Sequence, residues 1–301
     1  MNNYGTIYDD VFRTIQERHP ELLIPLINEA FHTNYSEKQK IKRLPEEYRK
    51  ILSNVVADSC FMIGKHIYHM ECQSTTDNKM ILRMMEYDFM IGLSQAEYEN
   101  GIWRIRFPHP CIFYLRHNHN TPDPEELEII FADGQMLRYR VPVIKAQVYS
   151  LEVLFQKKLY ICLPYYIMRY EKKFHEISHD PEKSEKLLTE YKQMLELLEV
   201  KMQHDENGLF QDLLRLIRKV AEFQLRNETE LQERMCNIMG GKVLPLPSDA
   251  LREAESKGAS NGELRVNKLI LALQSQGRTE EIITAASDRE YQKKLFEEFG
   301  I

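Results

Sequence analysis

The stretch 54-NVVADSCFMIGKHIYHMECQ-73 is the part of the chain that decides the fold. Two runs rich in β-branched, aromatic and sulfur-containing residues flank Gly64-Lys65. A two-residue loop that begins with glycine is typical of a type II′ β-hairpin, and a loop of this length fixes the register of the two strands. We therefore predict an antiparallel hairpin whose pairing is counted outward from the loop.

This register brings acidic side chains together. Counted outward, Cys60 faces His69 and Asp58 faces Glu71, and the alternation of side chains along a strand puts all four on one face of the sheet. Like charges directly opposite each other destabilise a sheet, and the surrounding apolar residues indicate a covered hairpin where a carboxylate is costly. Mg²⁺ takes oxygen ligands, usually one or two carboxylates with water and phosphate oxygens. Asp58 and Glu71 are therefore predicted metal ligands; the structural alternative is an exposed hairpin pair, or ion pairs with nearby lysines.

Regular elements are predicted on both sides of the hairpin. Apolar residues at helical spacing predict two short helices within residues 6–31 and a longer helix over 79–98. Further strands are expected at 111–115, 128–131 and 137–143, the last two joined by the hairpin signal Asp133-Gly134. Long amphipathic helices are predicted at 150–172, 181–203 and 207–239, with no strand beyond Tyr149. These elements indicate an α/β core with an all-helical C-terminal extension.

Length and composition place the chain among globular proteins. Its 301 residues are long enough to bury a core without disulfides or metals. The five cysteines form no C-x-x-C pair, the N-terminus has no signal-peptide pattern, and no apolar run approaches the ~20 residues that span a bilayer. We expect a cytoplasmic protein without a membrane partner. The spacing of His66, His69, His109, His117 and His119 matches no zinc site.

Turn-forming residues suggest the domain boundaries. Gly240-Gly241 and the prolines at 245 and 247 mark a linker. We predict a core over residues 1–175, a helical extension over 176–240, and a linker with a small helical module over 241–301. The amphipathic C-terminal helices are candidates for homo-oligomer contacts, or for packing within one chain.

The helix after the hairpin carries a candidate phosphate site. Arg83 and Tyr87 are four residues apart, so they lie on one helix face, where a guanidinium and a phenol can contact a phosphate. A surface ion pair and a packed tyrosine are the structural alternative.

Five ordered segments, YDDVFRTI, ADSCF, HMECQS, RMMEYDFMIGL and IFYLRHN, carry a family resemblance over about residues 6–172. They resemble the PD-(D/E)XK nuclease superfamily, and within it the Rpn-type recombination-promoting nucleases, which are also described as transposases. The resemblance implies a restriction-endonuclease-like central mixed sheet flanked by helices. It implies a DNA endonuclease that uses Mg²⁺ or Mn²⁺ to hydrolyse phosphodiesters, with a role in recombination or mobile elements.

The resemblance also assigns roles to individual residues. Asp58 and Glu71 would be metal ligands, completed by the backbone carbonyl of Cys72. Gln73 stands where most of the superfamily has lysine, and an amide can orient a water by hydrogen bonds but cannot lend it positive charge. Asp10, or else Asp9, would reach the metal through water; an acidic residue in the first turn of a helix is also favourable without any metal. The face with Arg83 and Tyr87 would lie beside the metal.

Charge alone does not predict a nucleic-acid partner. The net charge is −6, and the basic stretch from Lys38 to Lys50 is interrupted by Glu46 and Glu47. This stretch is either a DNA-contacting or a solvated loop. Two other functions therefore stay open: a degenerate nuclease core that serves DNA binding or assembly, and a helical interaction protein with a passive core.

Overall fold

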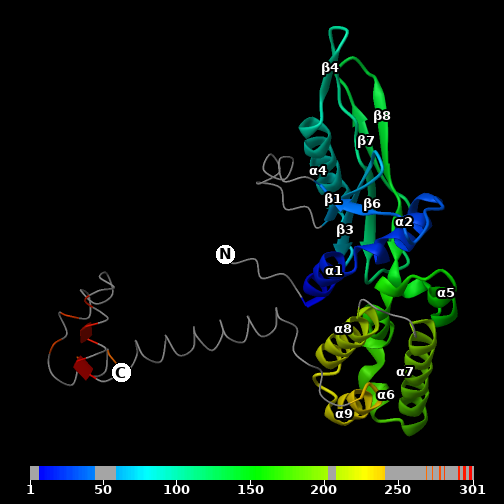
Figure 1. Cartoon of the computed structure of the whole chain (residues 1–301), viewed down its shortest axis with the longest axis vertical. Coiled ribbons are helices and arrows are strands. Elements are labelled where there is room, and N and C mark those ends of the chain that lie inside the picture. Colours follow the sequence, from blue (N-terminus) through cyan, green and yellow to red (C-terminus); the bar gives the residue numbers. More distant parts are fainter. Residues whose placement is uncertain are drawn as a thin grey trace. The chain divides into compact units, whose positions relative to one another are not determined.

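The computed structural model of the 301-residue chain describes residues 7–44, 59–202 and 208–240, and scattered positions between 269 and 299 (Figure 1). Two compact units are distinguished, Met1–Gly241 and Lys242–Ile301. In the second unit, Leu269, Leu273 and Leu295 form a small buried cluster. The predicted ligand Asp58 and most of the basic stretch after Lys42 lie outside the described residues, as does the predicted linker from Gly241 onward.

The first unit is built on a five-stranded mixed sheet with the order β1-β2-β3-β6-β9. The first two neighbouring pairs are antiparallel, and the pairs β3–β6 and β6–β9 are parallel. A mixed α/β architecture with a central sheet is therefore confirmed. The strands are β1 (Ile41–Arg43), β2 (Ser59–Ile63), β3 (His66–Gln73), β6 (His109–Tyr114) and β9 (Val143–Lys145).

The β2–β3 hairpin has the predicted register. Ile63 pairs with His66, Cys60 with His69, and Ser59 with Met70. Gly64 has a φ of +61°, the left-handed backbone that a II′ turn demands at its first loop position and that glycine adopts without strain. The pair Ser59–Met70 is the last one described before the predicted pair of Asp58 and Glu71.

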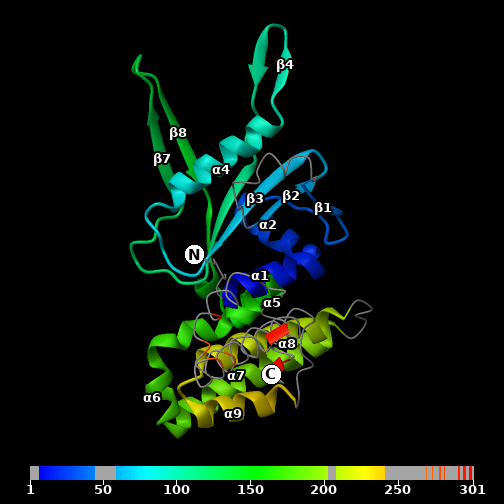
Figure 2. The ribbon, with the colours of Figure 1, turned by 90° about the vertical axis from the view of Figure 1, so that its left-hand side faces the viewer.

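Helices cover both faces of the sheet (Figure 2). On one face, α4 (Met80–Ser94) packs Met84 in a cluster with Ile112 and Tyr114. On the other face lie α1 (Ile7–Arg18) and α2 (Leu23–Phe31), which follow one another as predicted with a short 3₁₀ turn, η1 (Pro20–Leu22), between them. Phe12 of α1 contacts Phe113 of β6 with ring centroids 5.9 Å apart. The central strand β3 is thus enclosed between two helical layers.

Two hairpins extend beyond the central sheet, away from the C-terminal helices (Figure 2). They are β4 (Glu97–Glu99) with β5 (Ile102–Arg104), and β7 (Glu125–Ile130) with β8 (Met136–Val141). The Asp133-Gly134 hairpin was predicted, although β7 begins earlier than expected. The first hairpin was missed, and the prediction of a helix to residue 98 is wrong because the helix ends at Ser94. Asn100 and Gly101 both have positive φ, 52° and 79°, and form the two-residue loop of this hairpin.

The C-terminal half is helical, but two predicted helices were too long. The predicted helix at 150–172 is the short α5 (Leu151–Gln156), capped by Ser150, followed by a 3₁₀ helix, η3 (Tyr160–Lys173). Pro164 lies inside η3, and because proline has no N–H it cannot continue an α-helical ladder. The predicted helix at 207–239 consists of α8 (Leu209–Gln224) and α9 (Thr229–Ile238).

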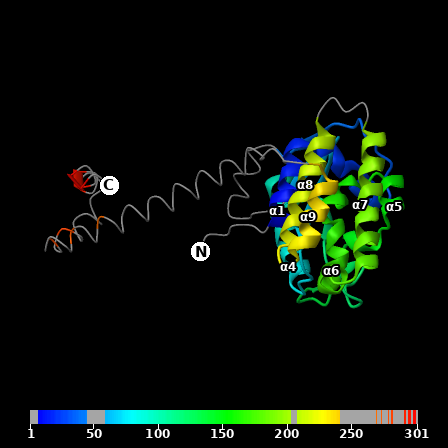
Figure 3. The same ribbon diagram turned by 90° about the horizontal axis from the view of Figure 1, so that it is seen from below.

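The remaining helices are α6 (Phe174–Ser178) and α7 (Pro181–Lys201). Figure 3 shows α7, α8 and α9 packed together. A buried contact of 2.8 Å between His19 Nε2 and Asp212 Oδ2 connects the end of α1 to α8. Across the described residues, none of the helices has the length and apolarity needed to cross a membrane, and no strand follows Lys145.

Candidate active site

Glu71 lies at the centre of the candidate site, on the central sheet of the first unit. Its strand β3 runs between β2 and β6, and Glu71 pairs with Ile112 of β6. His69, Glu71 and Gln73 share the face that α4 covers, because side chains alternate along a strand. The Glu71 side chain is fully buried, so its charge needs partners within the protein.

His69 is the first of these partners. Its Nε2 lies 3.0 Å from Glu71 Oε1, and its Nδ1 lies 2.6 Å from Asp88 Oδ1 of α4. All three side chains are fully buried. Burial by itself lowers the pKa of His69, but the hydrogen bonds to Asp88 and Glu71 outweigh it and raise that pKa to about 9. At neutral pH the imidazole is therefore a cation that donates one hydrogen bond to each carboxylate.

Asp88 is held from a second direction by the β7–β8 hairpin. The hydroxyl of Tyr139, on β8, donates a hydrogen bond to Asp88 Oδ2, so both oxygens of this carboxylate have a partner. Burial, together with the charge of Asp88, raises the pKa of the Cys60 thiol to about 12. Cys60 therefore lies beside the network as a neutral thiol.

The structure brings Arg83 and Tyr87 of α4 to the same face. Arg83 Nη2 lies 3.5 Å from Glu71 Oε2, and the Tyr87 ring lies 5.9 Å from the His69 ring. The Arg83 side chain is 40% exposed, whereas Glu71 is fully buried. Arg83 thus lies between Glu71 and solvent. From α4 its guanidinium is positioned to contact both the Glu71 carboxylate and a bound anion.

The other predicted residues have different positions. Gln73 is half-buried at the end of β3, and its backbone carbonyl accepts a hydrogen bond from the N–H of Leu115 at 2.8 Å. The Cys72 side chain is buried on the opposite face of the sheet, next to Glu71 in the chain. Asp10 is in the first turn of α1, the helix that covers this opposite face. Asp58 lies outside the described residues, and its predicted pairing with Glu71 therefore does too.

The described residues fit a hard divalent cation in their donor type. Glu71 offers a carboxylate, Gln73 an amide oxygen and Cys72 a backbone carbonyl, and oxygen donors are those that Mg²⁺ selects. Among the described residues, His69 and Arg83 are cations that contact Glu71, so positive charge already stabilises a carboxylate at this position. Since Arg83 is the exposed one, we expect a metal ion to compete with Arg83 and to leave His69 in place.

Sequence reasoning missed Asp88 and Tyr139. A signal for Asp88 was present, because it follows Met84 by four residues and precedes Ile91 by three, both buried members of the apolar stripe of α4. An acidic residue on an apolar stripe predicts a buried charge with a specific partner. No comparable signal exists for Tyr139, which reaches Asp88 from a strand 51 residues further along the chain.

Comparisons of the chain with protein-family models, with curated proteins and with solved structures gave no match. The assignment of a function therefore depends on the residues of the site and on the five sequence segments described above.

Proposed function

We propose that this protein is a metal-dependent DNA endonuclease that hydrolyses phosphodiester bonds and acts in recombination or on mobile elements. The observation that carries the proposal is the contact between the buried carboxylate of Glu71 and the half-exposed guanidinium of Arg83, on the central strand of a mixed sheet. The resemblance of the surrounding segments to PD-(D/E)XK nucleases of the Rpn type supports it.

In this proposal the chain provides an oxygen site for Mg²⁺ or Mn²⁺. Asp58 and Glu71 would hold the ion, with the Cys72 carbonyl beside them. Asp10 is not assigned to this site, because its helix α1 covers the opposite face of the sheet. The bound ion supplies a water of lowered pKa and neutralises charge on the phosphate. Arg83 and Tyr87 bind the phosphate, and a guanidinium suits this role because its planar donors match two phosphate oxygens.

His69 and Asp88 act as positioning residues. The His69 cation holds Oε1 of Glu71, and Asp88 together with the Tyr139 hydroxyl holds the imidazole, so the orientation of the Glu71 carboxylate is set before any ligand arrives. This support comes from α4 and from β8. In this proposal Oε2 of Glu71, which lies 3.5 Å from Arg83 Nη2, is the oxygen that binds the metal.

Gln73 changes the electrostatics relative to the lysine of most superfamily members. An amide orients the attacking water by hydrogen bonds but does not stabilise developing negative charge as an ammonium does. Within the part of the chain that the structure describes, Arg83 is the partly exposed cation that contacts Glu71, and we infer that it supplies the charge that Gln73 lacks.

The test uses the purified full-length protein and supercoiled plasmid in Mg²⁺, Mn²⁺, Ca²⁺ or EDTA. Glu71→Gln keeps the size of the side chain and removes its charge, so we expect Mg²⁺- or Mn²⁺-dependent nicking by the parent and none by this variant. Glu86→Gln is the matched control, because Glu86 is exposed on the same helix as Arg83. Nicking by Glu71→Gln at the parent's rate, or cleavage by the parent in EDTA, would refute the proposed site.

One observation favours a second candidate, a nuclease-like core that binds DNA or serves assembly without turnover. His69 and Arg83 together already place two cations against Glu71, so the site is electrically compensated by the protein alone. Calorimetric titration with Mg²⁺ distinguishes the two functions. Metal binding that is lost in Glu71→Gln supports the nuclease, whereas DNA binding without metal binding or cleavage supports the alternative.

A further inference from the structure

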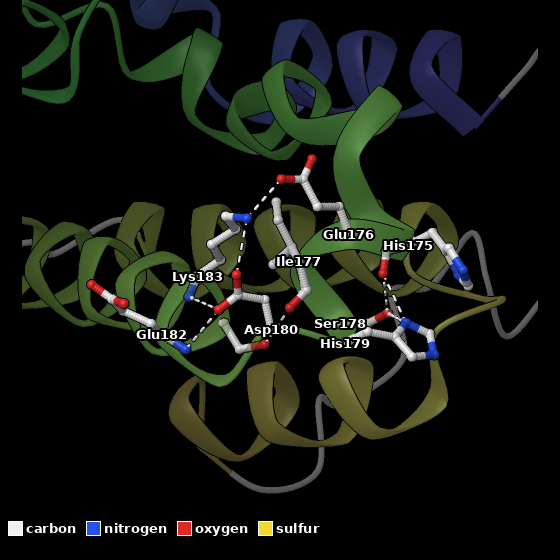
Figure 4. A network of polar contacts seen from close by, with 9 residues as sticks. His175, Glu176, Ile177, Ser178, His179, Asp180, Glu182 and Lys183 are labelled. Carbon is white, nitrogen blue, oxygen red and sulfur yellow. Dashed lines mark hydrogen bonds and ion pairs between the residues drawn. The ribbon is translucent and has the colours of Figure 1, made fainter.

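Three metal-binding side chains gather in the helical part of the first unit, separate from the proposed nuclease site. His175 is in α6, His179 follows this helix, and Glu228 directly precedes α9. One ligand atom from each of these three residues lies within 4.8 Å of the others. Figure 4 shows the two imidazoles together at the end of α6, and their ring centroids are 4.3 Å apart.

The backbone determines which nitrogen of His179 is available. Its Nδ1 lies 2.8 Å from the backbone carbonyl oxygen of His175 and 3.0 Å from Ser178 Oγ (Figure 4). A carbonyl oxygen only accepts hydrogen bonds, so Nδ1 carries the proton, and the lone pair of the neutral ring is then on Nε2. Histidines that bind metals commonly have this arrangement, in which the second ring nitrogen donates to a carbonyl and fixes the orientation of the ring.

Glu228 is also oriented by a neighbouring group. The Ser178 hydroxyl donates a hydrogen bond of 2.5 Å to Oε2, while Oε1 lies 3.6 Å from His175 Nδ1. Two ligands of a tetrahedral Zn²⁺ with bonds of roughly 2.0 to 2.1 Å are about 3.3 Å apart, so the His175–Glu228 separation is close to that of a bound pair. The Glu228 side chain is 15% exposed and the His175 side chain 86% exposed, so the carboxylate is anchored and the imidazole has room to close on an ion.

The donor set selects the class of metal. Two imidazoles with one carboxylate suit Zn²⁺ and the neighbouring divalent ions Co²⁺, Ni²⁺ and Cu²⁺, whereas Mg²⁺ and Ca²⁺ prefer sites made of oxygen alone. We propose that His175, His179 and Glu228 bind one divalent transition-metal ion, with Zn²⁺ as the reference ion and water completing its coordination. The ion would join α6 to the start of α9. Because His175 and Glu228 are 53 residues apart in the chain, this link would stabilise the packing of the C-terminal helices.

This site is independent of the proposed nuclease activity. The sequence prediction against zinc considered the histidines between His66 and His119 and did not include His175 and His179. Their spacing of four residues places two imidazoles on one side of a helix, which is a recognisable half of a metal site. The third ligand could come only from the tertiary structure.

The test titrates the metal-free full-length protein with ZnCl₂ by calorimetry and follows thermal melting with and without Zn²⁺. We expect a Zn²⁺ equivalent that Mg²⁺ does not displace and that raises the melting temperature. His175→Gln and Glu228→Gln each remove a ligand and should weaken Zn²⁺ binding at least ~10-fold. Ser178→Ala keeps all three ligands and should weaken Zn²⁺ binding by no more than about 100-fold, the upper end of the range for loss of an outer-shell partner.

Exposed His119 provides the control, since His119→Gln removes one imidazole elsewhere on the surface and should leave the titration unchanged. His175 is itself highly exposed, so its substitution removes a ligand without opening the core, and circular dichroism checks the fold of each variant. The proposal is overturned if His175→Gln and Glu228→Gln both bind Zn²⁺ with the parent's stoichiometry and affinity, or if the parent binds none. Because Glu71→Gln should retain this Zn²⁺ equivalent, failure here and failure of the nuclease proposal are separate results.

Discussion

The charge of buried His69 should make the stability of this protein depend on pH. Hydrogen bonds to Asp88 and Glu71 overcome the effect of burial and raise the pKa of His69 to about 9, compared with 6.5 for an ordinary histidine. The folded state therefore binds a proton more tightly than the unfolded state. Its contribution to stability is complete below pH 6.5, declines as the pH rises, and is lost above pH 9.

The magnitude follows from the same values. A rise in pKa from 6.5 to about 9 corresponds, at about 1.36 kcal/mol for each pH unit, to roughly 3 kcal/mol of unfolding free energy. No reduction for solvent screening is needed, because His69, Glu71 and Asp88 are all fully buried. A contribution of this size is a large part of the 5 to 15 kcal/mol that is typical of a folded protein.

The perturbation that isolates this contribution is His69→Gln, which keeps a polar side chain but cannot carry a proton. Urea unfolding of parent and variant would be measured between pH 5.5 and 10. The difference in unfolding free energy between the two proteins should shrink by about 3 kcal/mol over this range, because other titrating groups contribute to both and cancel. Exposed His119→Gln serves as the control and should follow the parent. A parent–variant difference that is constant across the range would refute a protonated His69 between two carboxylates.

Three further substitutions test the surroundings of the site. In Gly92→Ala the new Cβ would lie 2.7 Å from Ile105 Cγ2 and 3.2 Å from the Arg106 carbonyl oxygen. Despite the better helix propensity of alanine, we therefore expect the unfolding free energy measured in urea to fall by about 1 to 2 kcal/mol. A more stable variant would contradict this packing. Tyr139→Phe removes the hydroxyl that donates to Asp88 and should lower the unfolding free energy by about 1 to 3 kcal/mol in the same measurement. Tyr98→Phe, at an exposed position, is the control and should change it little. Equal losses of unfolding free energy would mean that the Asp88 contact is not stabilising. Gln73→Lys introduces an ammonium where charge develops and should retain or raise the rate of plasmid nicking; a folded but inactive Gln73→Lys protein would show that the amide has a specific role.

Local chemistry was enough to predict the hairpin at the centre of the sheet. The two-residue loop with Gly64 first determines the pairing of β2 and β3, because the loop length and the positive φ of its glycine leave one register that places the apolar side chains correctly. Helix α7 is similarly local, since Asp180 caps it through the N–H groups of Glu182 and Lys183. Interactions between near neighbours in the chain are sufficient for such elements.

Periodicity was a weaker guide to where helices end. It predicted one helix over 150–172, but Lys158 has a positive φ and the segment after it is a 3₁₀ helix with Pro164 inside. The apolar side chains of this segment are buried throughout, so the core accepts it in a conformation that the hydrophobic pattern does not distinguish from an α-helix. The same applies to residues 97–99, where the Asn100-Gly101 loop turns the chain into a hairpin.

The partners of the charged residues were decided by the tertiary structure. The sequence placed Glu71, Arg83 and Tyr87 on the faces where they are found, because strand and helix periods are local properties. It did not pair His69 with Asp88, nor Asp88 with Tyr139, since these contacts depend on how α4 and β8 pack over the sheet. Glu228 likewise approaches His175 only because α9 returns to α6. A charged residue on an apolar face of a predicted element indicates that it needs a partner. Which residue becomes that partner depends on the packing of segments that are far apart in the chain.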